Sequence, residues 1–300
     1  MKKLSIFACA VLGAAALFAD GGNLRYTISV SKFENRSGWN GQWDLGSAWG
    51  TILTDQLVQS GKFIVLGESD MRGAAMAEQD LAAAGRTAQG KKTPKMGRMS
   101  PAQLLVKGAI THVEEQKAGA GGGFNFKGIS LGGNGGKAEI NVTIYVVDSA
   151  TGQVKGSKSV VGSSGKRGIR LGYHGSKLGG LTGDLGGFDK DNVGIATTDA
   201  INQAMEYIIA QLDSIPWEGT VSLAKPDKLI INRGTREGVT VGMKFDIGTV
   251  EEIVDDDTGE VLDSEMTKIG TVVVTEVKEK IAYTTPLEGA EKGMGVHPAK

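Results

Sequence analysis

The sequence predicts a mixed α/β domain followed by a small all-β domain, and three observations lead to this prediction. Strand-like alternation and helix-like spacing follow one another up to about residue 216, which is typical of an α/β unit. After Trp217 no helical period appears, and short β-rich segments are separated by turn residues. Two glycine-rich segments interrupt the first part, and glycine occurs at about twice its usual frequency. We therefore expect an α/β domain over residues 20–216 and a small β-barrel or β-roll over residues 217–300.

The N-terminus carries an expected export signal. Two lysines precede an apolar run over residues 4–19, which is short for a membrane-spanning helix. We predict a signal peptide over residues 1–19, cleaved after Ala19. Cys9 is the only cysteine and lies inside this run, so the expected mature chain has no disulfide, cysteine metal site or cysteine nucleophile.

The first domain is expected to contain five strands and three helices. Asp44 precedes a run with helical apolar spacing that Gly61 ends, and Ser69 is the expected N-cap of the next helix. The expected elements are, in order, a strand at 24–33, a helix at 45–60, a strand at 62–66, a helix at 70–85, strands at 104–113, 138–147 and 154–161, and a helix through 201–212.

The two glycine-rich segments are candidates for membrane β-hairpins, at residues 118–146 and 162–190. A membrane strand needs only about 9 to 11 residues, so strands 122–131 and 137–146 could form one hairpin and strands 164–174 and 178–188 another. The apolar contacts would come from Phe124, Phe126, Ile129, Leu131, Ile169, Leu171, Tyr173, Leu178, Leu181, Leu185 and Phe188. Two hairpins cannot close a barrel, so several copies would have to share one. The alternative is that both segments are flexible linkers.

Composition and motifs argue against an enzyme and against a nucleic-acid partner. The net charge is −1 and no large basic patch is evident, which disfavours nucleic acid. His112, His174 and His297 have no metal-ligand spacing, and no phosphate-binding loop or nucleophile elbow occurs. The acidic run at 255–257 lacks the alternate spacing of a calcium loop and fits a hairpin turn better. We expect no catalytic residues, cofactor or metal.

The order of motifs resembles the CsgG family, the curli production assembly and transport proteins of the bacterial outer membrane. The resemblance is carried by FIVLGESDMRGAAMAEQDLAAAG, AQLLVKGAITHVEE, the glycine segment, INVTIYVVDSATGQV and ATTDAINQAMEYIIAQL, and it covers roughly residues 24–213. It implies a periplasmic α/β domain like anticodon-binding domains. It also implies two β-hairpins per subunit that join those of neighbours in one large oligomeric barrel. Residues 220–297 resemble the C-terminal domain of flagellar assembly protein T, which implies a small SH3-like β-barrel.

The chain departs from the family pattern in the expected pore loop. The stretch SGWNGQW at residues 37–43 is shorter than the family's loop and lacks its tyrosine and phenylalanine. Trp39, Asn40, Gln42 and Trp43 are the candidates for a pore constriction. The alternative is that the two tryptophans pack over the helix that starts near Asp44. No cysteine follows a complete signal peptide, and the C-terminal β domain is additional, so a curli substrate is not implied.

We therefore expect an exported protein that forms an oligomeric outer-membrane secretion channel or channel scaffold. Its partners would be further copies of itself, the outer membrane, and a secreted protein substrate or components of surface-appendage assembly. The alternative is a periplasmic assembly factor that forms no channel and serves a surface appendage or an envelope machine. In both cases we expect an exported protein that binds no nucleic acid. It would lie either in the outer membrane, facing the periplasm, or in the periplasm itself.

Overall fold

The computed structural model folds into two compact units, residues 25–216 and residues 217–300. The described residues are 24–116, 125–126, 129–130, 137–165, 191–212 and 215–299. Of the candidate hairpin residues, Phe126 and Ile129 are described in their backbone only. The others lie outside the described residues: Phe124, Leu131, Ile169, Leu171, Tyr173, Leu178, Leu181, Leu185 and Phe188.

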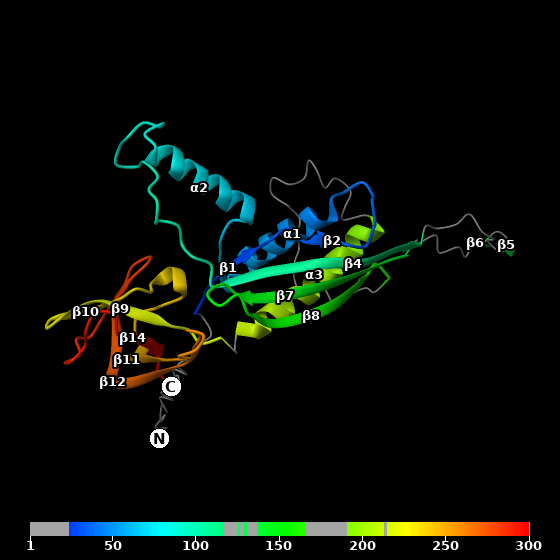
Figure 1. Cartoon of the computed structure of the whole chain (residues 1–300). Helices are drawn as coiled ribbons and strands as arrows, with labels where there is room; N and C mark the ends of the chain where they lie inside the picture. Colours follow the sequence, from blue (N-terminus) through cyan, green and yellow to red (C-terminus); the bar gives the residue numbers. More distant parts are fainter. Residues whose placement is uncertain are drawn as a thin grey trace, which may run out of the picture. The chain divides into compact units, whose positions relative to one another are not determined.

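The first unit is a mixed α/β fold built on one central sheet (Figure 1). Its elements are β1 (Tyr26–Val30), β2 (Glu34–Asn35), α1 (Leu45–Ser60), β3 (Phe63–Val65), α2 (Ser69–Ala83), β4 (Leu104–Gln116), β5 (Asn125–Phe126), β6 (Ile129–Ser130), β7 (Lys137–Asp148), β8 (Val154–Ser163) and α3 (Asn192–Gln211). The sheet has the order β3-β1-β4-β7-β8, and β2 pairs with β4. All eight expected elements are present, most with ends displaced by a few residues, but α3 begins at Asn192, nine residues before the expected start at Ile201.

Parallel and antiparallel pairing are combined in this sheet. β1 is parallel to β3 and β4, whereas β4, β7 and β8 form an antiparallel meander. The turn between β7 and β8 closes through the Asp148 N–H, which donates to the Gln153 carbonyl at 2.9 Å. Gly152 lies there with a φ of 74°, a conformation that favours glycine, as the turn signal in the sequence predicts.

The core lies between the sheet and the helices α1 and α3, which lie side by side (Figure 1). On β7 every second residue from Ala138 to Val146 is buried, as the alternation in the sequence predicts. Asp44 is the N-cap of α1, and Gly61 ends the helix with a φ of 63°. Both helix boundaries confirm the sequence prediction.

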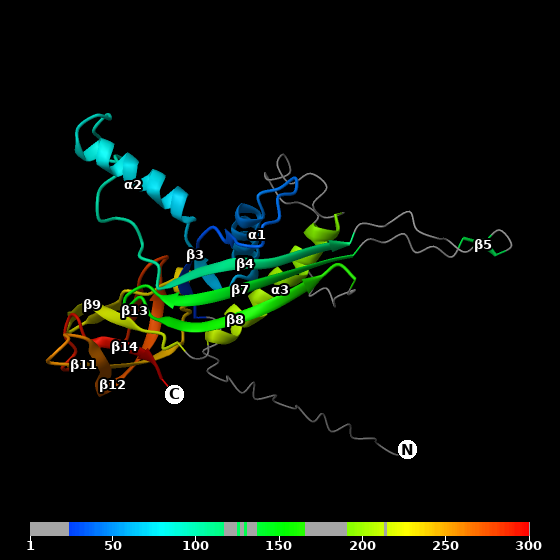
Figure 2. The same cartoon turned by 45° about the vertical axis from the view of Figure 1, so that its right-hand side comes forward.

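Helix α2 differs, because it stands away from the sheet (Figure 2). Ala82 is its only buried residue among those described. The expectation that Ser69 caps this helix is wrong, because Glu68 occupies the N-cap position, and the Glu68 side chain makes no capping hydrogen bond. The Ser69 hydroxyl instead lies 3.4 Å from the hydroxyl of Ser31.

Both glycine-rich segments depart from the same end of the sheet. Gln116, the last residue of β4, lies opposite Lys137, the first residue of β7. Ser163 at the end of β8 lies opposite Glu139 of β7. The chain therefore leaves the sheet twice within a few residues of one end, once after β4 and once after β8.

The pairing expected for the first candidate hairpin is wrong. Residues 137–146 do not pair with residues 122–131, because they belong to β7, which lies between β4 and β8 in the central sheet. Within the glycine-rich segment, β5 pairs with β6, and Phe126 lies opposite Ile129. The alternation of apolar residues identifies a strand but does not show which strand lies beside it. In the structure β7 pairs with β4 over nearly the whole length of both strands.

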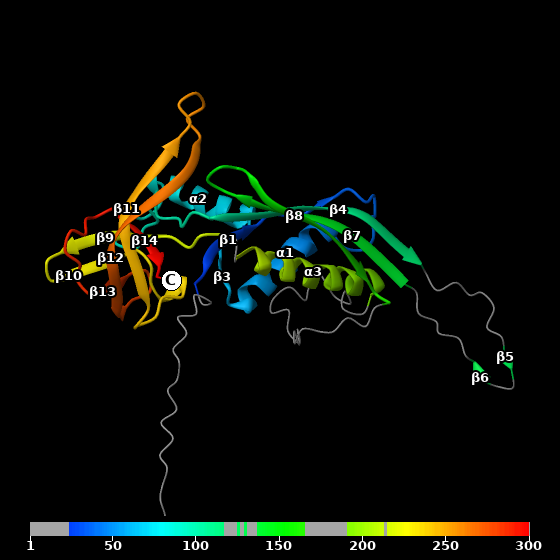
Figure 3. The same cartoon turned by 90° about the horizontal axis from the view of Figure 1, so that it is seen from below.

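The second unit is a closed barrel of six strands in the order β10-β13-β12-β11-β14-β9. Its elements are β9 (Gly219–Lys225), β10 (Lys228–Ile231), the 3₁₀ turn η3 (Thr235–Glu237), β11 (Lys244–Val254), β12 (Val261–Val277), β13 (Ala282–Thr284) and β14 (Gly295–Pro298). Trp217 stacks on Phe245 in its core, with ring centroids 5.2 Å apart. The hairpin of β11 and β12 extends beyond the barrel (Figure 3).

The acidic run at residues 255–257 forms the turn at the tip of this hairpin, as expected. The Asp255 carboxylate accepts hydrogen bonds from the N–H groups of Asp257 and Thr258, at 2.8 and 3.0 Å. These bonds hold the pKa of Asp255 below its ordinary value. Across the described part of the chain, no helix has the length and apolar character needed to cross a membrane.

Candidate functional site

The candidate site is the loop at residues 36–43, between β2 and α1, which holds the four candidate constriction residues. β2 runs parallel to β4, with Asn35 opposite Ile110. The Arg36 N–H donates to the Ile110 carbonyl at 2.8 Å, and the chain then leaves the sheet. Because β4 continues in the same direction to Gln116, the loop emerges toward the end from which both glycine-rich segments depart.

Side-chain hydrogen bonds fold the first half of the loop into a compact turn. The Asn35 side-chain oxygen accepts from the Ser37 N–H at 3.1 Å and from the Ser37 hydroxyl at 2.7 Å. The Asn35 side-chain amide donates to the Trp39 carbonyl at 3.0 Å, and the Trp39 N–H donates to the Ser37 hydroxyl oxygen at 3.2 Å. Gly38 stands at the centre with a φ of 74°. Two polar side chains thus fix the backbone that carries Trp39.

The ring of Trp39 lies against the backbone of Gly41. A Cβ atom at position 41 would lie 1.9 Å from Cη2 of the indole, so only glycine fits under the ring. Trp39 is half-buried, whereas Asn40 and Gln42 are exposed. The loop therefore presents two side-chain amides and a partly exposed indole to its surroundings.

Trp43 has a different environment from the other three candidates. Its side chain is 9% exposed, and it directly precedes the N-cap of α1. It belongs to the buried side chains of the subunit, as do Phe33 and Trp49 of α1, whose rings stack with centroids 4.9 Å apart. The structure thus brings the four candidates into one loop but divides them into two exposed amides, one half-buried ring and one buried ring.

Asp44 anchors the end of the loop to α1. Its carboxylate accepts from the N–H groups of Gly46 and Ser47, at 3.1 and 3.2 Å, and from the Ser47 hydroxyl at 2.8 Å. The Lys32 ammonium donates to Oδ2 of this carboxylate, the oxygen that also accepts from the Ser47 hydroxyl. The hydrogen bond from Lys32 is the main cause that lowers the pKa of Asp44 to about 2, with Ser47 assisting and partial burial opposing. The carboxylate is thus charged at neutral pH.

A second ion pair flanks the loop on β2. Arg36 lies 2.6 Å from the carboxylate of Glu34, and this hydrogen bond holds the pKa of Glu34 below its ordinary value and that of Arg36 above it. Both side chains are exposed, so we assign the pair no stabilising role.

The loop has the chemistry of a contact surface. Amides and an indole can bind a passing polypeptide by hydrogen bonds and apolar contact, and none of the four residues is a general acid or base. No cluster of three or more histidine, cysteine or carboxylate side chains that could bind a metal occurs within the described ranges.

Sequence reasoning missed the two residues that organise the loop, Asn35 and Ser37. A sequence signal was present, since asparagine followed two residues later by serine is typical of a turn closed by the asparagine side chain. Lys32 carried no such signal, because its partner Asp44 lies twelve residues away, across the loop.

Three solved structures are similar to this chain at low identity. The hypothetical protein CT253 from Chlamydia trachomatis is 12% identical, with 64% of this chain and 99% of that chain covered and a TM-score of 0.37. The LpoB C-terminal domain from Escherichia coli is 16% identical, with 48% and 87% covered and a TM-score of 0.27. The PelC dodecamer from Paraburkholderia phytofirmans is 14% identical, with 45% and 72% covered and a TM-score of 0.25.

Family assignment rests on a different comparison. A search of curated proteins gave no match to this sequence. The model of one protein family matches residues 19–227, which include the whole α/β unit and the first strand of the barrel. The chain therefore belongs to the CsgG family, the curli production assembly/transport components.

Proposed function

We propose that this protein is an oligomeric outer-membrane secretion channel, or the scaffold of one, that exports extended polypeptide. Membership of the CsgG family indicates a role related to curli production or secretion. The observation that favours a channel is the convergence at one end of the sheet. Both glycine-rich segments depart there, and the loop at residues 36–43 emerges toward the same end.

In the proposed assembly, each subunit contributes its two glycine-rich segments to a barrel shared with neighbouring copies. A single chain would supply too few strands to close a barrel in a membrane. The α/β unit, which we take to be like anticodon-binding domains, would face the periplasm. The loop would then lie below the barrel mouth, and its copies would form a ring.

Transport in this proposal is passive. Asn40 and Gln42 are the exposed members of the loop, and Trp39 is partly accessible, so these three side chains would contact an extended cargo. Trp43 would support the loop from within. We propose no catalytic residue, cofactor or nucleotide, because neutral amides and indoles perform no acid–base chemistry at neutral pH.

The test is a length-preserving replacement of the apolar residues in the first glycine-rich segment. Phe124→Ser, Phe126→Ser, Ile129→Ser and Leu131→Ser together should release the protein from outer membranes into a carbonate wash, with unchanged circular dichroism. The wild-type protein should stay in the membrane and give ring-shaped particles in detergent by electron microscopy. The matched control is Met71→Ser with Met76→Ser, which removes exposed apolar side chains from α2 and should leave the protein in the membrane.

A second candidate function is a periplasmic assembly factor that forms no channel. The closed barrel at residues 217–300 favours it, because this unit lies almost wholly beyond the family match and would be a natural docking module. We take that barrel to be SH3-like, serving a surface appendage or envelope machine. Wild-type protein that carbonate releases fully, as monomers, would favour this function and contradict the channel.

A further inference from the structure

The hairpin of β11 and β12 extends beyond the barrel as an isolated two-stranded ribbon, here called the acidic arm (residues 249–267). The pairing of β14 with β11 ends at Gly248, and the pairing of β13 with β12 begins at Val274. Between these points each strand has only the other as a neighbour in the described structure (Figure 3). The arm contains no lysine or arginine, and its eight acidic residues are Glu251, Glu252, Asp255, Asp256, Asp257, Glu260, Asp263 and Glu265.

Two features of the acidic arm are unfavourable for the stability of a β-hairpin. Glu251 lies directly opposite Glu265, and like charges in that position repel. A lone two-stranded hairpin is also marginally stable in water. Val254 and Val261 oppose each other near the tip and are 44% and 46% exposed, and Leu262 is 61% exposed. A ribbon that is both acidic and apolar gains little within its own subunit, which indicates a partner surface.

A surface of opposite charge exists on the same chain, here called the basic segment (residues 86–98). It contains no aspartate or glutamate, and its five cations are Arg86, Lys91, Lys92, Lys95 and Arg98. None of the five takes part in an ion pair with any described residue. Against eight negative charges on the arm, the segment thus offers five free positive charges.

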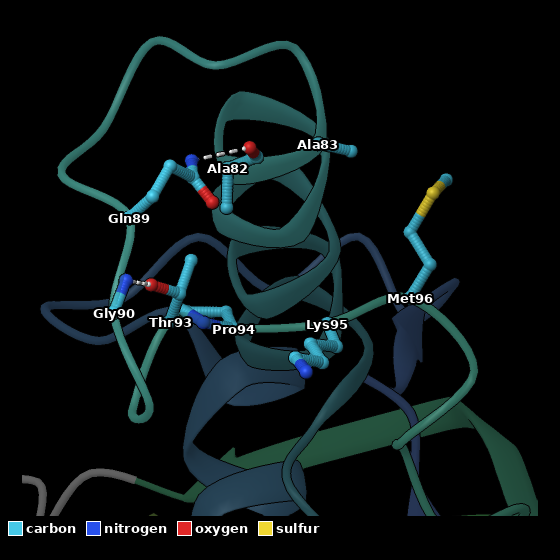
Figure 4. A pocket seen from close by; sticks show the side chains of 8 residues that line it. All are labelled: Ala82, Ala83, Gln89, Gly90, Thr93, Pro94, Lys95 and Met96. Atoms are coloured by element: carbon cyan, nitrogen blue, oxygen red, sulfur yellow. Dashed lines mark hydrogen bonds between the residues drawn. The ribbon is translucent and has the colours of Figure 1, made fainter.

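The basic segment is held in a defined shape against the end of α2. The Gln89 side-chain amide donates to the Ala82 carbonyl at 2.9 Å, and the Gly90 N–H donates to the Thr93 hydroxyl oxygen at 2.6 Å (Figure 4). The Arg86 N–H donates to the Leu81 carbonyl at 2.9 Å. These bonds make the segment a preformed surface.

An open groove of about 550 Å³ lies between the basic segment and α2 (Figure 4). Ala82, Ala83, Pro94 and Met96 give it an apolar lining, and Lys95 also lines it. The side chain of Met96 is 64% exposed. The groove therefore combines apolar walls with positive charge, which is the complement of the acidic arm.

We propose that the acidic arm of one copy docks onto the basic segment of a second copy of this chain. Opposite charges would steer the two surfaces together, and the apolar residues of the arm tip would enter the groove beside α2. Both surfaces occur once per chain, so each copy can donate one arm and accept another in a head-to-tail contact, which closes into a ring or continues as a filament. This inference goes beyond the proposed channel and does not rest on it, because it uses neither glycine-rich segment.

The experiment is site-specific disulfide cross-linking between two full-length variants in mild detergent. One carries Leu262→Cys on the arm, and the other carries Met96→Cys at the groove. Because Cys9 is the chain's only cysteine, both variants are made with Cys9→Ala. Mixing them should give a covalent dimer at low salt, and the yield should fall about tenfold near 1 M salt, where the screening length is short. The matched control replaces Leu262→Cys by Val58→Cys, an exposed position on α1, and should give no dimer above background.

Charge reversal then tests the pairing itself. On the arm variant the changes are Glu251→Lys, Glu252→Lys, Asp256→Lys, Asp257→Lys and Glu265→Lys. On the groove variant they are Arg86→Glu, Lys91→Glu, Lys92→Glu, Lys95→Glu and Arg98→Glu. Either reversal alone should lower the cross-linking yield about tenfold, and the two reversed variants together should restore it, which a folding defect would not do.

Three outcomes would overturn the proposal. The first is a yield no higher than the Val58→Cys control. The second is a yield that neither salt nor charge reversal changes. The third comes from a further variant that carries both Leu262→Cys and Met96→Cys in one chain: if it cross-links within itself while the mixed variants give no dimer, the contact is within a subunit. Failure of the proposed channel would leave this readout unchanged, because cross-linking needs no membrane insertion.

Discussion

Helices α1 and α2 are almost equal in length, 16 and 15 residues, yet they differ strongly in how much of their surface is buried. Nine residues of α1 are buried, whereas Ala82 alone is buried in α2. α1 has an aspartate N-cap, whereas the N-cap residue of α2 makes no side-chain hydrogen bond, and a left-handed glycine follows each helix, Gly61 after α1 and Gly85 after α2. Most helical stability in proteins comes from packing of an apolar face. The comparison teaches that α1 is stabilised by burial within its own subunit, whereas most of α2 stays exposed.

The largest expected effect tests the packing of α1. Trp49 is fully buried and stacks on Phe33. Trp49→Ala should reduce the free energy of unfolding by about 3 to 5 kcal/mol, because it removes a buried aromatic side chain and leaves a cavity. The matched change in α2 is Met76→Ala, at a position 51% exposed, which should stay within about 0.5 kcal/mol of wild type. Urea unfolding followed by circular dichroism measures both, and equal losses would contradict the comparison.

The next effect tests the close contact between α1 and the chain before the loop. A Cβ atom on Gly46 would lie 2.1 Å from the carbonyl oxygen of Phe33, a backbone atom that cannot move alone. Gly46→Ala should therefore destabilise the protein by about 1 to 3 kcal/mol, although alanine favours helices more than glycine does. Gly50→Ala in the same helix is the control, because its Cβ would meet neighbours at ordinary distances of 3.5 Å or more. A stabilising Gly46→Ala would show that the contact is not tight.

A smaller effect tests the cap that joins the loop to α1. Asp44→Ala should cost about 1 kcal/mol, the usual value of a helix N-cap. Asp44→Ser should retain most of this stability, because serine is also a good N-cap.

The same position predicts a pH dependence. The folded-state pKa of Asp44 is lowered from 3.8 to about 2, chiefly by Lys32, so its contribution is present above about pH 4 and is lost as the pH falls through about 2. Wild-type protein should therefore lose more stability between pH 4 and pH 2 than Asp44→Ser does, as thermal melts at each pH would measure. Parallel pH profiles would contradict the role of the carboxylate.

Sequence patterns predicted α1 better than the loop or α2, for physical reasons. The apolar spacing and the caps of α1 involve residues that are close in the sequence, so they can be recognised from the sequence alone. The Lys32–Asp44 pair and the buried state of Trp43 depend on where the chain returns, so the sequence supported both a pore residue and a packed residue at position 43. The pairing of residues 137–146 was mistaken because period-2 alternation identifies a strand but not its neighbour. The candidate hairpin side chains remain predictions.

The smallest expected effect has the opposite sign and returns to α2. Gly73 lies inside this helix, and a Cβ atom there would meet nothing within 4 Å. Gly73→Ala should therefore stabilise α2 by up to about 1 kcal/mol, because alanine restricts the unfolded chain and clashes with nothing. If no partner covers α2, this helix should unfold locally while the core stays folded. The added stability should then appear as slower amide hydrogen exchange within residues 69–83. The midpoint of global unfolding should not change. A matching rise in global stability would mean that α2 unfolds together with α1, and that the two helices are energetically more alike than their burial indicates.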